Sequence, residues 1–389
     1  SITDAPNGRV LISWTSDAPV DGGNPSDVYG RLFRIGTIAD HAFLATTMND
    51  RGLGTAAANT VDLLEGADWY NALGGNDTVT GGNGHDFLIG GAGDDSLLGG
   101  FGFDVLQGSA GNDVLDGGYD FSDWVLFEGN RRVTVNLTLT TAQNTGQGMD
   151  TILSVENIRS GGGNDRLTGN ALDNRLESGA GNDMLLAGDG TDVLSGGAGD
   201  DSCYGGAGYD YLHVDAGNDL LDGGADSASL LYDGSANGVV NLQTGRATFV
   251  GLGTDTLRNI HVVQSGSGHD RLTGNAGFNN LYGRGGRDTI TGGGGDDNIL
   301  LDEGAGTVEA WRFADVMIFR SGDDNDQVLH FDNDLDELRL DITGITTAAQ
   351  ALALASDYYG SVRFEFGNGD TLRIGGITMA DLADDIVIL

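Results

Sequence analysis

Hydrophobic residues recur every nine positions through much of this chain, and the polar residues between them follow the same period. Residues 81–107 read GGNGHDFLI, GGAGDDSLL and GGFGFDVLQ. Each unit has Gly at positions 1, 2 and 4, Asp at position 6 and an apolar residue at position 8. A period of nine belongs neither to a helix nor to a strand. Each unit therefore predicts a turn followed by a short strand.

Each half of a unit has a physical basis. Repeated Gly tolerates positive φ and close approach of the backbone, so positions 1–6 predict a tight turn. In residues 87–89 the side chains alternate outward, inward and outward, so one apolar side chain per unit points into a core. Two units then form one flattened coil, and turns on the same edge are 18 residues apart. The prediction is an all-β fold, a parallel β-roll.

Burial alone cannot stabilise such a coil. One inward Leu contributes ~1.5–3 kcal/mol, whereas ordering the backbone costs ~1–2 kcal/mol for each residue of the unit. The position-6 carboxylates would also repel one another along the stack unless a cation lay between them. Carboxylate and carbonyl oxygens favour Ca²⁺ over Mg²⁺ or Zn²⁺. We therefore expect structural calcium ions between the turns, about ten by the number of units.

These glycine-rich nonapeptides resemble those of the RTX (repeats-in-toxin) family. The resemblance implies a parallel β-roll that folds when it meets external calcium. It also implies export by the type I secretion machinery of a Gram-negative bacterium, and a place outside the cell or at its surface. It does not imply toxicity.

The units fall into three blocks, at about 63–116, 160–222 and 265–300. Because alternate turns stack, each ion is expected between position-6 residues 18 apart, which gives eleven pairs from Asp68/Asp86 to Asn279/Asp297. An amide oxygen coordinates without charge, so the two Asn sites should be weaker. The predicted ligands are Asp68, Asp77, Asp86, Asp95, Asp104, Asp113, Asp165, Asn174, Asp183, Asp192, Asp201, Asp210, Asp219, Asp270, Asn279, Asp288 and Asp297.

Two related stretches, 117–159 and 223–264, separate the blocks. VTVNL at 133–137 aligns with VVNL at 239–242, and MDTI at 149–152 aligns with TDTL at 254–257. A longer repeat therefore overlies the nonapeptides. Both stretches predict strand-rich inserts that continue the solenoid as longer coils without calcium turns.

The two ends of the chain lack the nonapeptide. Residues 1–53 predict an N-terminal β-hairpin segment with strands at 10–14 and 28–33, and 54–300 predict the roll. Residues 301–389 predict a β-rich cap with one helix at 347–355 and a hairpin of 362–366 with 371–374. FRSGDDND at 319–326 resembles the C-terminal segment of serralysin-type RTX proteases. The ending DDIVIL at 384–389 resembles a type I secretion signal, with a last cap strand as the alternative.

The net charge of the chain and the absence of catalytic and membrane-spanning motifs reduce the number of function classes that fit it. A net charge of −39 disfavours nucleic acid and anionic membranes as partners. Cys203 is the only cysteine and occupies an inward position 8, so it predicts a small buried hydrophobe. No His-Glu-x-x-His and no Gly-x-Ser-x-Gly motif is present, and no run of 18 apolar residues could span a membrane.

The favoured interpretation is a secreted, non-catalytic RTX protein or fragment whose β-roll folds with calcium. One alternative is the tail of a secreted polysaccharide-active enzyme, lipase or protease with its catalytic domain upstream of Ser1. Another is an adhesin or surface-layer component that binds a protein or a surface polysaccharide through the flank of the solenoid. An outward apolar row of Trp69, Phe87 and Val105 predicts a covered surface, either by the strands around Trp14 and Phe33 or by a partner.

Overall fold

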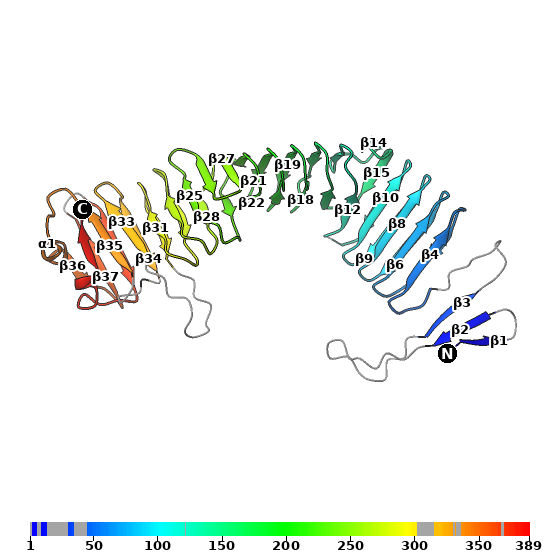
Figure 1. Ribbon diagram of the computed structural model, residues 1–389, viewed down its shortest axis with the longest axis horizontal. Coiled ribbons are helices and arrows are strands. Elements are labelled where there is room, and N and C mark those ends of the chain that lie inside the picture. Colours follow the sequence, from blue (N-terminus) through cyan, green and yellow to red (C-terminus); the bar gives the residue numbers. More distant parts are fainter. Residues whose placement is uncertain are drawn as a thin grey trace.

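The strands of this protein stack side by side along a curved arc (Figure 1). The computed structural model describes residues 2–5, 9–13, 30–34, 45–120, 122–301, 315–329, 331, 336–366 and 369–389. Nearly every described element is a strand, and most neighbours pair in parallel with a register of 18 residues, as Trp69 does with Phe87. The predicted all-β fold and parallel β-roll are confirmed.

One long sheet runs the whole length of the arc, and its strands alternate along the chain with those of the opposite side. Its pairing is parallel up to β38 and antiparallel from there to β36. The strands in spatial order are β4 (Arg51–Thr55), β6 (Trp69–Leu73), β8 (Phe87–Ala92), β10 (Val105–Ala110), β12 (Trp124–Phe127), β16 (Asn157–Ser160), β18 (Arg175–Glu177), β20 (Val193–Ser195), β22 (Asp210–His213), β24 (Ala228–Leu231), β28 (Val262–Gln264), β30 (Asn280–Tyr282), β32 (Asn298–Leu300), β34 (Asn325–Leu329), β38 (Thr371–Gly375), β37 (Ser361–Glu365) and β36 (Ala355–Asp357).

The opposite side consists of two sheets that meet at the first insert. Sheet II comprises β5 (Thr60–Asp62), β7 (Thr78–Asn83), β9 (Ser96–Phe101), β11 (Val114–Gly118), β15 (Met149–Leu153) and β14 (Gln143–Asn144). Sheet III comprises β13 (Thr134–Asn136), β17 (Arg166–Thr168), β19 (Met184–Asp189), β21 (Ser202–Ala207), β23 (Leu220–Gly224), β27 (Gly253–Arg258), β26 (Arg246–Phe249), β25 (Gly238–Asn241), β29 (Arg271–Thr273), β31 (Thr289–Thr291), β33 (Val316–Arg320), β35 (Glu337–Asp341) and β39 (Ile386–Ile388).

The core is a single file of apolar side chains between the long sheet and sheets II and III. Leu88, Leu97, Leu106 and Leu115 are each at most 1% exposed, and they occupy position 8 of successive units. Cys203 lies in the same file at 1% exposure, where it pairs in register with Leu185 and Leu221. It therefore packs as the small hydrophobe that its position predicts.

The inserts do not continue the solenoid simply as longer coils, so that prediction is wrong in part. On the long sheet, β12 and β24 do continue the parallel stack. On the other side the chain doubles back, because β27, β26 and β25 pair antiparallel before β25 resumes parallel pairing with β29. The first insert has the same antiparallel turn between β14 and β15.

In the first insert a side chain replaces part of the ladder between sheets II and III. Gln143 is 8% exposed, and its amide oxygen accepts the Asn136 N–H at 2.8 Å. Its amide nitrogen donates to the Asn136 carbonyl oxygen at 3.1 Å. The side chain thus satisfies both backbone groups that a paired strand would have satisfied.

The N-terminal strands differ from the predicted pair. β1 (Ile2–Ala5), β2 (Arg9–Ser13) and β3 (Gly30–Arg34) form a separate three-stranded antiparallel sheet, and the sequence pattern did not identify β1. The stacked strands begin with β4, inside the segment 1–53 that was assigned to the hairpin. Trp69 and Phe87 are half-buried, and the Arg51 guanidinium lies 5.3 Å from the Trp69 ring. The side chains of Trp14 and Phe33 lie outside the described residues, so their covering role stays a prediction.

The C-terminal part contains α1 (Ala348–Leu352) and a 3₁₀ turn, η1 (Leu382–Asp384). The helix is shorter than predicted. Thr347 and Gln350 form a capping box at its start, but residues 355–357 form β36 because they pair with β37. The predicted hairpin is present as β37 and β38. No helix among the described residues is long and apolar enough to cross a membrane.

Candidate calcium sites

The acidic turn residues form two rows, one along each edge of the roll. The first row lies at the starts of the long-sheet strands, and the second lies at the starts of the strands of sheets II and III. Each named acid or amide in both rows is at most 5% exposed. The first row contains Asp68, Asp86, Asp104, Asp123, Glu156, Asn174, Asp192, Asp210, Asn279, Asp297 and Asp326. The second row contains Asp77, Asp95, Asp113, Asp150, Asp165, Asp183, Asp201, Asp219, Asp255, Asp270, Asp288, Asp315 and Asp336.

Each row is a hydrogen-bonded ladder. Asp86 Oδ1 accepts the backbone N–H of Asp68 at 2.8 Å, and Asp104 Oδ1 accepts that of Asp86 at 2.8 Å. The same bond joins both members of every predicted pair, over 2.6–3.1 Å. The structure therefore brings all eleven predicted pairs together, at a spacing of 18 residues.

The second oxygen of these carboxylates is the unusual feature of the site. Oδ2 is buried and has no hydrogen-bond partner in the Asp residues of most units. A buried ionised oxygen without a donor costs several kcal/mol or more of solvation free energy. These orphaned oxygens belong to Asp68, Asp77, Asp86, Asp95, Asp104, Asp113, Asp123, Asp165, Asp183, Asp192, Asp201, Asp210, Asp270, Asp297 and Asp326.

Backbone carbonyls face the same space as the orphaned oxygens. A methyl group built on Gly99, the first residue of its unit, would overlap both Asp104 Oδ2 and the carbonyl oxygen of Gly117 in the next coil. Two acceptors therefore converge there, and no donor lies between them. A carboxylate and carbonyls from flexible turns are the oxygen donors that Ca²⁺ uses. At Gly99 a side chain would fill that space.

Burial raises the pKa of these carboxyl groups. It raises the pKa of Asp104 to about 7; the hydrogen bond from the Asp86 N–H opposes the shift, and neighbouring carboxylates add to it. Burial likewise raises the pKa of Asp113 to about 7, against the hydrogen bond from Asp95 and with added repulsion from Asp150. A bound cation would favour the ionised form instead.

The two Asn units are built differently. Asn174 Oδ1 accepts the Asn170 N–H at 2.7 Å within its own turn, and its Nδ2 donates to the Glu156 carbonyl at 2.8 Å. Asn279 Oδ1 accepts the Asn275 N–H at 2.7 Å in the same way. In both units the amide oxygen already accepts a hydrogen bond inside its own turn, a stronger reason for a weak cation site than the loss of charge.

Several acids of the two rows lie outside the nonapeptide units, so the repeat pattern did not predict them. Asp123 follows Asp104 after 19 residues, and its Oδ1 accepts the Asp104 N–H at 2.8 Å. The inserts were expected to lack calcium turns, but Asp150 and Asp255 also extend the second row, since they accept the N–H groups of Asp113 and Asp219. Asp150 and Asp255 occupy equivalent positions of the longer repeat, and this equivalence is the feature of the sequence that could have identified them.

The rows also continue beyond the third block. Asp326 accepts the N–H of Asp297, and Asp315 and Asp336 extend the second row. Asp336 is only 5% exposed, so this acid is buried in the row. Irregular spacings of 29, 27 and 21 residues conceal these acids in the sequence.

A third ladder runs through position 5 in the opposite direction. Asp94 Oδ1 accepts the Asn112 N–H of the next coil at 2.8 Å, and Asn76 Oδ1 accepts that of Asp94 at 3.1 Å. His85 Nδ1 takes the same role toward Phe103 at 2.8 Å. A side chain with an acceptor at position 5 can therefore hold the N–H of the equivalent residue in the next coil.

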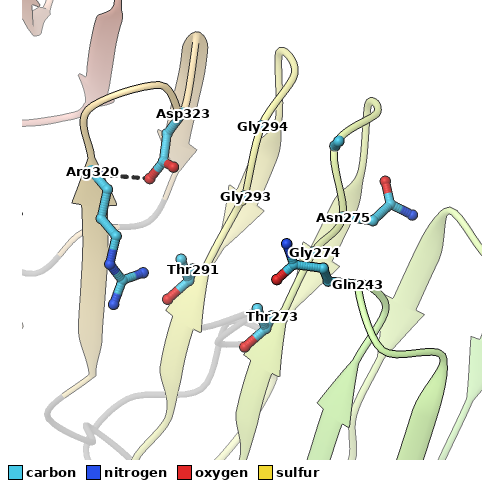
Figure 2. Close-up of a pocket in the computed structure, with 10 residues that line it drawn as sticks. Gln243, Thr273, Gly274, Asn275, Thr291, Gly293, Gly294, Arg320 and Asp323 are labelled. Carbon is cyan, nitrogen blue, oxygen red and sulfur yellow. Dashed lines mark hydrogen bonds between the residues drawn. The ribbon is translucent and has the colours of Figure 1, made fainter.

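A shallow cavity of about 240 Å³ lies on the outer side of sheet III, over β29, β31 and β33 (Figure 2). Its lining includes Thr273, Thr291 and Gln243, and Arg320 lies at one end. Asp323 Oδ2 accepts the Arg320 N–H at 2.6 Å, so this carboxylate is already engaged. The lining contains no Ser, Cys or His nucleophile or base.

Among the described residues, no group of three or more His, Cys, Asp or Glu side chains gathers as a ready-made metal centre. The rows differ from such a centre because each turn contributes one carboxylate, and the other oxygens at Gly99 come from the backbone.

A matched pair of glycines tests the space at the turn. We expect Gly99→Ala to weaken calcium binding at its turn without changing any charge, because the methyl group would overlap Asp104 Oδ2 and Gly117 O. Gly74→Ala is the control, since its methyl group meets nothing nearer than 3.4 Å. Calcium binding by titration calorimetry distinguishes them, and equal affinities for the two variants would contradict this use of the space.

The match to a family model agrees with this geometry. The model of the RTX calcium-binding nonapeptide repeat (four copies) matches about half of the chain, over residues 45–79, 62–97, 71–106, 89–120, 155–185, 168–203, 177–212, 195–230 and 264–307. No curated protein sequence matches the chain. Among solved structures, the extracellular lipase LipA from Serratia marcescens is similar at 20% identity, with a TM-score of 0.23. The alignment covers 55% of this chain and 41% of the lipase, so the chain spans less than half of that enzyme's length.

Proposed function

Because this chain belongs to the RTX calcium-binding nonapeptide repeat family, we propose that it is a secreted protein, or a part of one, in which Ca²⁺ drives the folding of a structural β-roll outside the cell. The observation that supports this proposal is the set of buried Asp Oδ2 atoms without a hydrogen-bond partner. A fold that buries so many bare carboxylate oxygens needs a counter-charge at each turn.

The seventeen predicted ligands would act in pairs along the two rows, and each pair would hold one ion. In the pair Asp86/Asp104 the free Oδ2 of each residue and the turn carbonyls would coordinate, while Oδ1 keeps its bond to the ladder. Bound calcium supplies positive charge between the coils. The chain supplies the oxygens, and its glycines supply the space.

Calcium concentration would then act as the folding switch. With a dissociation constant of ~10⁻⁴ M, typical of extracellular modules, and calcium near ~1 mM, each filled site adds about 1.4 kcal/mol to the stability of the fold. At the far lower concentration of a cytosol the sites would be empty. Repulsion among the carboxylates would then keep the chain extended and fit for export.

We also place the protein outside a Gram-negative cell, exported by a type I machinery, and assign it no catalytic step. The family match supports the secreted location. The end that resembles a secretion signal forms β39, which pairs with β35 at the end of sheet III. The segment can therefore be read during export and still close the roll after folding.

A calcium titration of the full chain tests the proposal. Far-ultraviolet circular dichroism is expected to show little β-structure in chelator and a cooperative gain of it with Ca²⁺. Equal concentrations of Mg²⁺ should not replace Ca²⁺, because Mg²⁺ demands a stricter octahedral geometry. The same β-sheet signal in chelator and in calcium would overturn the proposal.

A further inference from the structure

The two inserts occupy equivalent places in the roll, but their buried turn residues differ. Asp123 precedes β12 and faces Glu156, and Ala228 at the start of β24 faces His261. Ala228 lies 105 residues after Asp123, and His261 lies 105 residues after Glu156, so the two pairs occupy equivalent positions. One insert thus carries two acids where the other carries none.

In the first insert these acids continue the first row. Asp123 Oδ1 accepts the Asp104 N–H at 2.8 Å, and Glu156 Oε2 accepts the Asp123 N–H at 3.1 Å. Asn174 completes the link, since it donates to the Glu156 carbonyl and its N–H reaches Asp192 Oδ1 at 2.7 Å. The row is therefore continuous from the first block to the second.

The space at Asp123 matches that of a nonapeptide turn. Asp123 is fully buried, and its Oδ2 has no hydrogen-bond partner. A methyl group built on Gly117 would overlap both this oxygen and the carbonyl oxygen of Ser154. The same two kinds of oxygen converge beside Gly99, inside a repeat.

In the second insert the same position is apolar. A methyl group built on Gly223 would meet the Ala228 side chain in place of a carboxylate. His261 Nδ1 is buried without a hydrogen-bond partner, and Asn279 Nδ2 bonds to Phe278 O and not to residue 261. Over these described residues, no side-chain bond links Asp210 to Asn279.

The second row cannot make the connection at either insert. Asp150 and Asp255 end its first two segments, because β15 and β27 there turn to antiparallel partners. The next segments begin where Asp165 and Asp270 accept the N–H groups of Val133 and Gly238, which carry no ligand. Any ion-mediated coupling between blocks must therefore run along the first row.

We propose that Asp123 and the Ser154 carbonyl form a cation site for Ca²⁺ outside the nonapeptides, which Glu156 positions by accepting the Asp123 N–H, and that this site joins the first two blocks into one folding unit. Ala228 and His261 leave the third block and the C-terminal cap as a second unit. In a stack of nearest-neighbour contacts, cooperativity ends where a contact is lost. This inference rests on the proposed calcium-driven folding.

Hydrogen exchange of the full chain at stepped free Ca²⁺, read by mass spectrometry, tests the inference. In the parent protein, residues 63–116 and 165–222 are expected to gain protection at one calcium concentration and residues 265–300 at another. Asp123→Asn keeps an acceptor for the Asp104 N–H but removes a charged ligand. It should bind fewer ions in equilibrium dialysis and separate the first two blocks, with a loss of about tenfold in the folding constant when calcium is ten times the dissociation constant.

Glu128→Gln is the matched control, because it removes the same charge from an exposed position of the same insert. A second variant, Ala228→Asp with His261→Glu, should gain bound calcium and merge all three blocks, and it keeps the test open if Asp123→Asn fails to fold. One shared midpoint for all blocks in the parent protein, or equal bound calcium in Asp123→Asn and Glu128→Gln, would overturn the inference. If calcium protects no block at all, the proposed function itself fails.

Discussion

Asp95→Ala is expected to raise the calcium concentration needed for folding more than Asp68→Ala does. Asp95 lies between two carboxylates with orphaned oxygens, Asp77 and Asp113, so its loss affects two pairs. Asp68 has such a neighbour only in Asp86, because the Asp50 carboxylate already accepts the N–H and the hydroxyl of Thr46. Two lost sites correspond to about 100-fold in the folding constant and one to about tenfold, at ten times the dissociation constant.

The two substitutions are matched in their backbone effects. Each removes one bond from the ladder, to the N–H of Asp77 at 2.8 Å or to that of Asp50 at 2.6 Å. Circular dichroism against free calcium gives both midpoints. Equal midpoints would show that Asp95 does not serve two sites.

Acidification is expected to stabilise the calcium-free roll and to destabilise the calcium-bound one. Burial raises the pKa of Asp104, Asp113 and Asp201 to about 7, partly opposed by backbone hydrogen bonds, whereas an unfolded Asp titrates near ~3.9. The folded chain therefore binds protons more tightly than the unfolded chain. Its stability is highest below the unfolded value and is lost as the pH rises toward about 7.

Calcium reverses this dependence, because protons compete with the ion for the same oxygens. Thermal unfolding between pH 4.5 and 7.5 checks both signs, in buffer stripped of calcium and in millimolar calcium. The midpoint temperature should rise on acidification without calcium and fall with it. Parallel curves in the two buffers would mean that the titrating carboxylates are not the calcium ligands.

The nonapeptide period alone determined the β-roll and the pairing of the predicted ligands. A repeat of nine places every second turn on the same edge, so Asp86 must lie next to Asp68 and Asp104 once the coils stack. The same local rule predicted the inward position of Cys203. These features depend only on the geometry of one unit and its neighbours.

Only the tertiary structure showed how the chain pairs and packs where the nonapeptide repeat is interrupted. The antiparallel turn of the inserts, the shortened helix α1 and the third strand β1 all depend on partners distant in the sequence or on weak local signals. Asp123, Asp150 and Asp326 became members of the rows because backbone N–H groups of preceding coils reach them, although their spacings differ from 18. Spacing predicts contact only while the coil length is constant, and once it changes only the packed fold shows which acids meet.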